Sequence, residues 1–180
     1  SQFITGFMFV LPLLNQDSTL TITKPYESKS YVNLTIQMLA KFGIEIIETS
    51  SNSYLIKGNQ HYKAQDVSVE GDFSQLAFFA VLGTLNNTLS CSNMDMSSIQ
   101  GDKAILDCIP SFTSKEDTIT FAKKQPAPQT IDLSNCPDLG PILCVLASFT
   151  NGETNIVNAA RLRMKESDRI LAMETELKKW

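Results

Sequence analysis

The most constraining feature of this sequence is one pattern of elements that occurs three times. Each copy has an apolar helical stretch, turn residues rich in Asn or Gly, a short β-branched strand and an amphipathic helix. The strands, predicted at Thr19–Thr23, Thr88–Ser92 and Thr154–Val157, begin 69 and then 66 residues apart. This spacing is too long for a solenoid repeat. It predicts an α/β (α+β) fold of tandem units, each with a buried helix, an amphipathic helix and a small mixed sheet.

The two helices of each copy differ in how their apolar residues are distributed. The first is apolar on most faces, which is typical of a helix inside the fold. The second carries one apolar stripe, for example Tyr31, Leu34, Met38 and Phe42. The first helices are predicted at Gln2–Leu14, Phe73–Leu85 and Asp138–Phe149, and the second at Ser28–Phe42, Gln100–Phe112 and Lys165–Trp180. Further strands are predicted at Ile44–Thr49, Tyr54–Lys57, Val67–Glu70, Thr118–Ala122 and Thr130–Leu133.

The copies are expected to share one topology and to pack against one another. A unit of this size cannot close its own core, so several units must pack together. Glu70-Gly71-Asp72 is a candidate boundary between two lobes, which would place residues 1–70 in one and 71–180 in the other. The alternative is an ordinary strand-to-helix turn in which Asp72 caps the following helix.

Composition excludes several classes of protein. The net charge of −4 argues against a nucleic-acid partner. The longest apolar stretch, Phe7–Leu14, is too short to span a membrane. Four cysteines without a CxxC pair and a single histidine, His61, predict reduced thiols in a cytoplasmic chain and no metal site. Neither end carries a leader or a helix stop signal, so we expect a piece of a longer protein.

The stretch Arg161–Arg169 carries the strongest chemical signal, because four cations fall at the predicted start of a helix. The helix dipole favours anions there, so this composition indicates a site for an anionic ligand. Glu166 continues the stripe Ile170, Met173 and Leu177, which places its carboxyl group toward the packed side, where burial raises a pKa and the neighbouring cations lower it. We interpret Glu166 as a proton donor at a pocket edge. The alternative is a solvated helix start with surface ion pairs.

Other polar residues open predicted helices. Asp138, after Pro137, is either a general base at the mouth of a pocket or a carboxylate that satisfies free helix amides. Ser1-Gln2 and the segment Ser28–Tyr31 either cap their helices or bind phosphate and hydroxyl groups.

Together these pieces resemble the EPSP synthase family of enolpyruvyl transferases. The matching motifs follow the family's order and spacing across the whole chain, and the run Lys165–Arg169 is the most specific. The motifs are Ser1-Gln2-Phe3, Ser28–Tyr31, Val69-Glu70-Gly71-Asp72 with Ser74, Gln100-Gly101-Asp102, Pro137-Asp138 and Lys165-Glu166-Ser167-Asp168-Arg169.

The resemblance implies two lobes of three similar α/β units and transfer of the enolpyruvyl group of phosphoenolpyruvate to shikimate 3-phosphate. It implies that Asp138 removes the proton of the 5-hydroxyl group and that Glu166 protonates the methylene carbon. It implies that Lys165 contacts shikimate 3-phosphate and that Arg169 holds phosphoenolpyruvate. It further implies that shikimate 3-phosphate is bound by Ser1, Gln2 and Ser28, with Tyr31 nearby.

The same resemblance implies no metal or organic cofactor, no membrane partner and a monomeric whole protein. This chain alone would be inactive, and it would self-associate or be marginally stable. There are two departures from the family pattern. A second serine is missing before Ser1, and Arg161 stands where some members have an asparagine that contacts substrate.

Two alternatives differ in class. One is the related UDP-N-acetylglucosamine enolpyruvyl transferase, which typically has a reactive cysteine in a Gly-rich loop. None of the four cysteines here lies in such a loop. The other is a non-catalytic module that binds anions or a partner.

Overall fold

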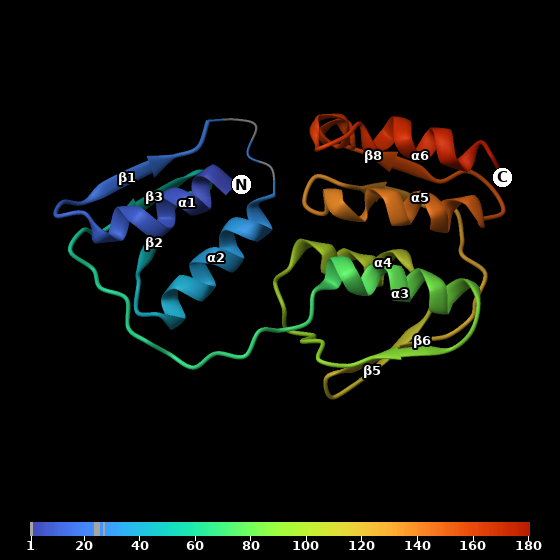
Figure 1. The fold of residues 1–180 in the computed structure, drawn as a ribbon, viewed down its shortest axis with the longest axis horizontal. Coiled ribbons are helices and arrows are strands. Elements are labelled where there is room, and N and C mark those ends of the chain that lie inside the picture. The colour runs from blue at the N-terminus through green and yellow to red at the C-terminus, as the bar shows by residue number, and fades with distance from the viewer. Residues whose placement is uncertain (1, 24–25, 27) are drawn as a thin grey trace. The chain divides into compact units, whose positions relative to one another are not determined.

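The computed structural model describes residues 2–23, 26 and 28–180, and it divides into two compact units, Ser1–Ser68 and Val69–Trp180 (Figure 1). Both units combine helices with small sheets, so the predicted α/β class is confirmed. The division falls just before the predicted boundary at Glu70-Gly71-Asp72. The assignment of each unit to a separate lobe stays a prediction.

The first unit packs two helices and one sheet around a single core. Its elements are α1 (Gln2–Val10), η1 (Leu11–Leu13), β1 (Ser18–Thr21), α2 (Lys29–Lys41), β2 (Ile46–Ser50) and β3 (Ser53–Ile56). The strand order is β1-β3-β2, and both pairs are antiparallel. Alternate side chains of a strand point to one face, so Tyr54 and Ile56 of β3 are both buried. They share a core with Met8 of α1 and Leu39 of α2.

The second unit contains a larger core and two sheets. Its elements are α3 (Phe73–Leu85), β4 (Leu89–Cys91), η2 (Gly101–Ala104), α4 (Ile105–Cys108), β5 (Phe112–Lys115), β6 (Thr118–Phe121), β7 (Thr130–Asp132), η3 (Pro137–Leu139), α5 (Gly140–Ser148), β8 (Asn155–Val157), η4 (Ala160–Met164) and α6 (Arg169–Leu177). One sheet is antiparallel, in the order β4-β6-β5, and β7 pairs with β8 in parallel. Helices α3 and α5 pack against each other in one core.

The first two copies of the repeat share one topology, as predicted. In each, a helix, a strand and a second helical segment precede an antiparallel hairpin, and the orders β1-β3-β2 and β4-β6-β5 are equivalent. The third copy comprises α5, β8 and α6, and its strand pairs with β7, which precedes α5. Its strand order can therefore be compared with the others only in part.

The segment Val67–Glu70 is not a strand, but one backbone hydrogen bond joins the residue after it to the chain that follows β4. The Gly71 amide donates to the Asn93 carbonyl at 2.7 Å, as the Leu133 amide donates to Val157 at 3.0 Å after β7. A Cβ atom at Gly71 would lie 2.5 Å from the Asn93 oxygen, so glycine permits this approach. The Asp72 side chain then accepts from the Ser74 amide at 2.8 Å and caps α3, as the turn interpretation expected.

The predicted helix Gln100–Phe112 is wrong. A short 3-10 turn and four α-helical residues end at Cys108, and strand β5 begins at Phe112. Ile109 has extended backbone angles, φ −96 and ψ 146, because Pro110 disfavours a helical conformation in the residue before it. The periodic apolar residues predicted a helix, and the proline effect overrode them.

The expected burial of the first helices holds for α3 and fails for α1. Seven residues of α3 are buried, whereas Met8 is the one buried residue of α1, and the Phe3 side chain is 88% exposed. Within the described first unit, only one face of α1 meets the sheet and α2, and its other apolar residues have no covering layer. The stripe of α2 is also rotated, because Val32, Ile36 and Leu39 pack into the core in place of the predicted set.

Three further features of the described residues concern the cysteines, the potential metal ligands and the helix lengths. The four cysteines are free thiols, and burial raises the pKa of Cys136 to about 12 and of Cys108 to about 11, so both are unreactive. Among the described residues, no group of three His, Cys, Asp or Glu side chains could hold a metal ion. None of the described helices has the length and apolar character to cross a bilayer.

Candidate active site

Four charged residues of the predicted site come together in the second unit. Asp138 is the middle residue of η3, and α5 begins directly after this turn at Gly140. Arg169 is the first residue of α6, while Lys165 and Glu166 lie in the connection between η4 and α6. The packing of α6 against α5 brings the two helix starts together.

Asp138 is the centre of this cluster. Its Oδ1 atom accepts from Arg169 Nη1 at 2.9 Å and from Lys165 Nζ at 3.3 Å. The other terminal nitrogen of the guanidinium group, Nη2, donates to Glu166 Oε1 at 2.6 Å. Hydrogen bonds to Glu166 and then to Asp138 raise the pKa of Arg169. Two carboxylates thus neutralise two cations at a helix start where the dipole disfavours positive charge.

Glu166 does not face the packed side, contrary to the prediction from helical periodicity. The predicted helix began at Lys165, but α6 begins at Arg169, so Glu166 lies outside the helix and the stripe argument does not apply to it. Its side chain is 71% exposed. A backbone hydrogen bond and then the Arg169 side chain lower the pKa of Glu166. In this arrangement Glu166 is therefore ionised at neutral pH.

Asp168 explains where α6 begins. Its Oδ1 atom accepts from the Leu171 amide at 3.0 Å, and Oδ2 accepts from Arg163 Nη1 at 2.9 Å. A capping aspartate satisfies a free amide and complements the dipole, so the helix starts directly after it. The same bond to the Leu171 amide, followed by the pair with Arg163, lowers the pKa of Asp168.

Replacing the cap should destabilise α6 in a way that depends on side-chain chemistry. Asp168→Ala is expected to lower the urea midpoint of the chain, whereas Asp168→Asn keeps an acceptor and should lower it less. Because the folded pKa of Asp168 is depressed, its contribution is present above the unfolded pKa and lost as pH falls through the folded one. Urea titrations at neutral and acidic pH measure both effects, and equal losses in the two variants would contradict a capping role.

The remaining predicted site residues occupy other positions. Arg161 lies in η4, and Gln2, Ser28 and Tyr31 belong to the first unit. Ser28 is buried and precedes α2 with a left-handed φ of 55°, a conformation that is strained for a residue other than glycine. Its side chain makes no capping hydrogen bond, so the capping interpretation is wrong for Ser28. Ser1 lies outside the described residues.

Sequence reasoning missed the partnership of Asp138 with Arg169 and the role of Gln100. Gln100 donates to Glu70 Oε1 and to the Gly71 carbonyl, both at 2.9 Å, and accepts from the Phe73 amide at 2.9 Å. It therefore joins the segment before α3 to the start of that helix. These contacts span about 30 residues of sequence and have no signal in local periodicity.

Comparison with solved structures defines the class of fold. EPSP synthase from Acinetobacter baumannii matches with a TM-score of 0.76 at 20% identity, over 99% of this chain and 42% of that chain. The enolpyruvyl transferase NikO from Streptomyces tendae matches with a TM-score of 0.69 at 17% identity, over 87% of this chain and 38% of that chain. The chain therefore has an enolpyruvyl transferase type of fold.

Sequence comparison then gives the family. The family model for EPSP synthase (3-phosphoshikimate 1-carboxyvinyltransferase) matches residues 1–180, and the chain belongs to that family. A 3-phosphoshikimate 1-carboxyvinyltransferase of Clostridium acetobutylicum is 51% identical over 181 residues, and one of Clostridium kluyveri is 48% identical over 183. Each alignment covers 99% of this chain but only 42% and 43% of those relatives. The chain thus spans less than half the length of these curated relatives.

Proposed function

We propose that this chain is part of a cytoplasmic enzyme that transfers the enolpyruvyl group of phosphoenolpyruvate to the 5-hydroxyl group of shikimate 3-phosphate, with release of phosphate. This reaction belongs to aromatic amino-acid biosynthesis. The observation that carries the proposal is the cluster in which Asp138 accepts from Arg169 and Lys165 while Arg169 also holds Glu166. Family membership supports it. The reaction needs a base, an acid and cations for two anionic substrates, and the cluster offers two carboxylates and two cations for these tasks.

Asp138 is the proposed base and Glu166 the proposed acid. Asp138 takes the proton from the 5-hydroxyl group while the hydroxyl oxygen attacks the central carbon of phosphoenolpyruvate. Glu166 gives a proton to the methylene carbon. The ionised Glu166 then takes a proton back from the methyl group so formed while phosphate leaves, and this elimination restores the double bond. Two carboxylates in different surroundings can take the two tasks. In the described state Glu166 accepts a hydrogen bond from Arg169, and this bond is one cause of the lowered pKa of Glu166. An anionic substrate that draws Arg169 away would remove this cause, so Glu166 could hold a proton more readily.

The other predicted residues bind substrate in this proposal. Arg169 holds phosphoenolpyruvate, and Lys165 contacts shikimate 3-phosphate. Gln2, Ser28 and Tyr31, together with Ser1, bind shikimate 3-phosphate, and Arg161 adds positive charge near it. Charge-assisted hydrogen bonds of this kind are strong enough to orient a bound anion. No metal or organic cofactor takes part in the proposed chemistry.

Arg169→Ala tests the substrate assignment in a complete enzyme. A suitable host is a chimera in which residues 1–180 replace the matching region of the Clostridium acetobutylicum relative, which aligns with 99% of this chain. The variant should raise the KM for phosphoenolpyruvate by about tenfold or more, because a charged hydrogen-bond partner is lost. Lys178→Ala, at the residue that follows the end of α6, is the control and should leave both KM values unchanged. An unaltered KM for phosphoenolpyruvate in Arg169→Ala would remove Arg169 from that role.

The isolated chain should show no turnover. It covers about 43% of its relatives, so a large part of any complete site lies outside it, and small misplacements of catalytic groups already cost about 100-fold. It also exposes apolar side chains such as Phe3, Phe78 and Phe79, which favour self-association. A coupled phosphate-release assay, run beside light scattering at several concentrations, tests both points. Steady turnover by the pure chain would overturn the first, and a concentration-independent monomer the second.

A further inference from the structure

Two tyrosines of the first unit are joined through their hydroxyl groups, whose oxygen atoms lie 2.8 Å apart. Tyr54 lies in β3 and is completely buried, while Tyr26 precedes α2 and packs against the same core. Tyr26 is two residues before Ser28, one of the residues proposed to bind shikimate 3-phosphate. We propose that Tyr54, acting through Tyr26, is a positioning residue that holds Ser28 in the conformation that binds this substrate. The inference rests on the proposed function.

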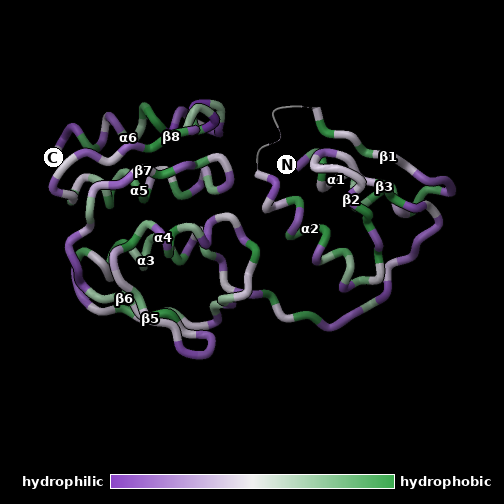
Figure 2. Tube along the Cα trace, turned by 180° about the vertical axis from the view of Figure 1, so that it is seen from behind, coloured by the Kyte–Doolittle hydropathy of each residue, from purple (hydrophilic) through white to green (hydrophobic). Residues whose placement is uncertain are grey.

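Ser28 has a backbone conformation that needs support from its surroundings. Its φ of 55° and ψ of 40° lie in the left-handed region, where a residue other than glycine is strained. Such a conformation persists only when neighbouring contacts determine it. Figure 2 shows hydrophobic and hydrophilic residues alternating along α2, as expected for a helix with one packed side. The first buried residue of this helix is Val32, so contacts made ahead of it decide where Ser28 lies.

The β2–β3 hairpin holds the chain on both sides of Ser28. Before Ser28, the Tyr26 hydroxyl group is bonded to that of Tyr54 in β3. After Ser28, the Lys29 Nζ atom donates to Glu48 Oε1 of β2 at 2.6 Å. Glu48 lies directly opposite Tyr54 in the pairing of β2 with β3, so both contacts come from one place in the sheet. The Lys29 ammonium group also lies 5.9 Å from the centre of the Tyr26 ring, which links the two contacts.

The second copy of the repeat shows that packing alone does not require these polar groups. Strands β3 and β6 have equivalent places in their sheets and the same alternation of burial. In this equivalence Tyr54 corresponds to Ile119, which is also 0% exposed. Glu48 corresponds to Ser114, because Ser114 lies opposite Ile119 as Glu48 lies opposite Tyr54. An apolar side chain thus fills the position in β6, and the hydroxyl group of Tyr54 is not needed to fill space.

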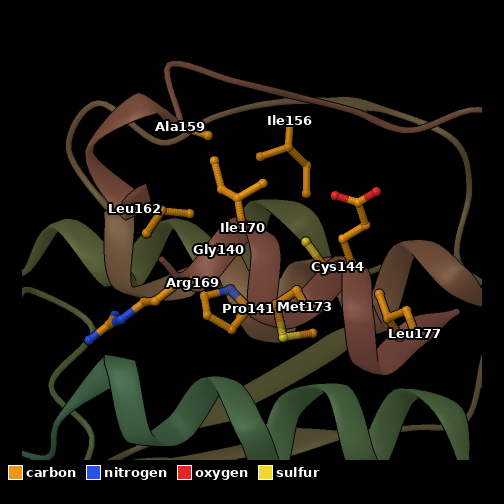
Figure 3. Close-up of a pocket in the computed structure, with 11 residues that line it drawn as sticks. Gly140, Pro141, Cys144, Ile156, Ala159, Leu162, Arg169, Ile170, Met173 and Leu177 are labelled. Atoms are coloured by element: carbon orange, nitrogen blue, oxygen red, sulfur yellow. The ribbon is translucent and has the colours of Figure 1, made fainter. Parts of the chain in front are cut away.

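The third copy shows what a hairpin contributes by packing. In the described part of the chain no hairpin follows α6, and an apolar hollow of about 280 Å³ remains between α5, β8 and α6 (Figure 3). In the first two copies the hairpin covers apolar surface, and β3 and β6 each contribute two buried residues. Covering the core therefore explains the burial of the Tyr54 ring but not the bond that its hydroxyl group makes.

The tyrosine pair is the stronger of the two contacts. The side chains of Lys29 and Glu48 are 32% and 43% exposed, and water weakens exposed ion pairs of this kind. Tyr54 is shielded from water, so solvent cannot replace a lost partner of its hydroxyl group. Burial and then the hydrogen bond to Tyr54 raise the pKa of Tyr26, so Tyr26 stays protonated at neutral pH.

Tyr54→Phe in the chimera tests the proposal, because it removes only the hydroxyl group. The Kd for shikimate 3-phosphate, measured by titration, should rise about fivefold, within the range for loss of one hydrogen bond. The kcat and the KM for phosphoenolpyruvate should change by less than about twofold, since the proposed role of Ser28 concerns the other substrate. Tyr62→Phe is the matched control. Its hydroxyl group donates to the Phe9 carbonyl at 2.8 Å in the same unit, and its removal should leave the binding of both substrates unchanged.

A double-variant cycle shows whether Tyr54 acts through Ser28. Ser28→Ala removes the hydroxyl group proposed to bind substrate, so adding Tyr54→Phe to it should weaken shikimate 3-phosphate binding no further. Additive losses would contradict the proposal, as would equal weakening in Tyr62→Phe, which would indicate a general loosening of the first unit. If Tyr54→Phe does not fold, Tyr26→Phe removes the same bond at a half-buried position and should give the same result.

The unsubstituted chimera separates this inference from the proposed function. If it binds shikimate 3-phosphate and Tyr54→Phe binds it equally well, the positioning role is wrong and the proposed function stands. If the folded, unsubstituted chimera does not bind shikimate 3-phosphate, the proposed function fails and the positioning role fails with it.

Discussion

Glu166→Gln in the chimeric enzyme should lower turnover by about 100-fold or more, the range expected when a general acid is lost. Binding of shikimate 3-phosphate should change little, because proton transfer contributes to the transition state and not to the ground state. Glutamine keeps the size of the side chain and can still accept from Arg169, so the loss would reflect the missing proton. Steady-state kinetics for both substrates, with direct titration of shikimate 3-phosphate, measure the two quantities separately.

The pH dependence sharpens this test. A backbone hydrogen bond and Arg169 depress the pKa of Glu166, so the free enzyme should lose its protonated acid at low pH, before neutrality is reached. If bound substrate draws Arg169 away, kcat should begin to fall at a higher pH than kcat/KM does, because kcat reports the pKa of Glu166 in the complex. Glu153→Gln, a change at an exposed glutamate in the turn before β8, is the control. Unchanged turnover in Glu166→Gln would exclude Glu166 from the mechanism.

Leu143→Ala should lower the free energy of unfolding by about 2–5 kcal/mol, the range for truncation of a buried leucine. Leu143 is 0% exposed in the middle of α5 and belongs to the core that α3 and α5 share. The core surrounds this side chain, so the cavity left behind cannot collapse fully. Urea unfolding followed by circular dichroism gives the change in the midpoint and in the slope.

Leu171→Ala is the matched control for this experiment. Leu171 is 56% exposed on α6, so the same chemical change should cost no more than about 0.5 kcal/mol. Both leucines lie on helices of the second unit, α5 and α6, and they differ in burial. Similar losses in the two variants would mean that α5 is not the central helix of a packed core.

Predictions from the sequence succeeded where one local signal was strong. Asp72 supplies the cap and an apolar run follows, so the bounds of α3 were predicted to the residue. The repeat predicted equivalent strand orders in the first two copies because each copy is a local supersecondary unit. The predictions failed where two local signals competed. At Ile109 the apolar periodicity favoured a helix, whereas the following Pro110 disfavours that conformation, and Ile109 is extended.

The candidate site could be predicted as a set of residues but not as an arrangement. The cation-rich run at 161–169 was visible, since cations at a predicted helix start violate the dipole preference. The bond from Arg169 to Asp138 joins residues 31 positions apart and depends on the packing of α5 against α6. The orientation of Glu166 depended on whether α6 begins at residue 165 or 169, and the cap at Asp168 decided it.

Phosphate release by the chimera tests the central claim most directly, namely that this segment supplies the acid, base and cations for enolpyruvyl transfer. With shikimate 3-phosphate and phosphoenolpyruvate together, the chimera should release phosphate steadily, and omission of either substrate should stop it. The double variant Asp138→Asn with Glu166→Gln should be inactive while remaining folded. A chimera that folds but releases no phosphate with both substrates, or a double variant that retains full activity, would contradict the account.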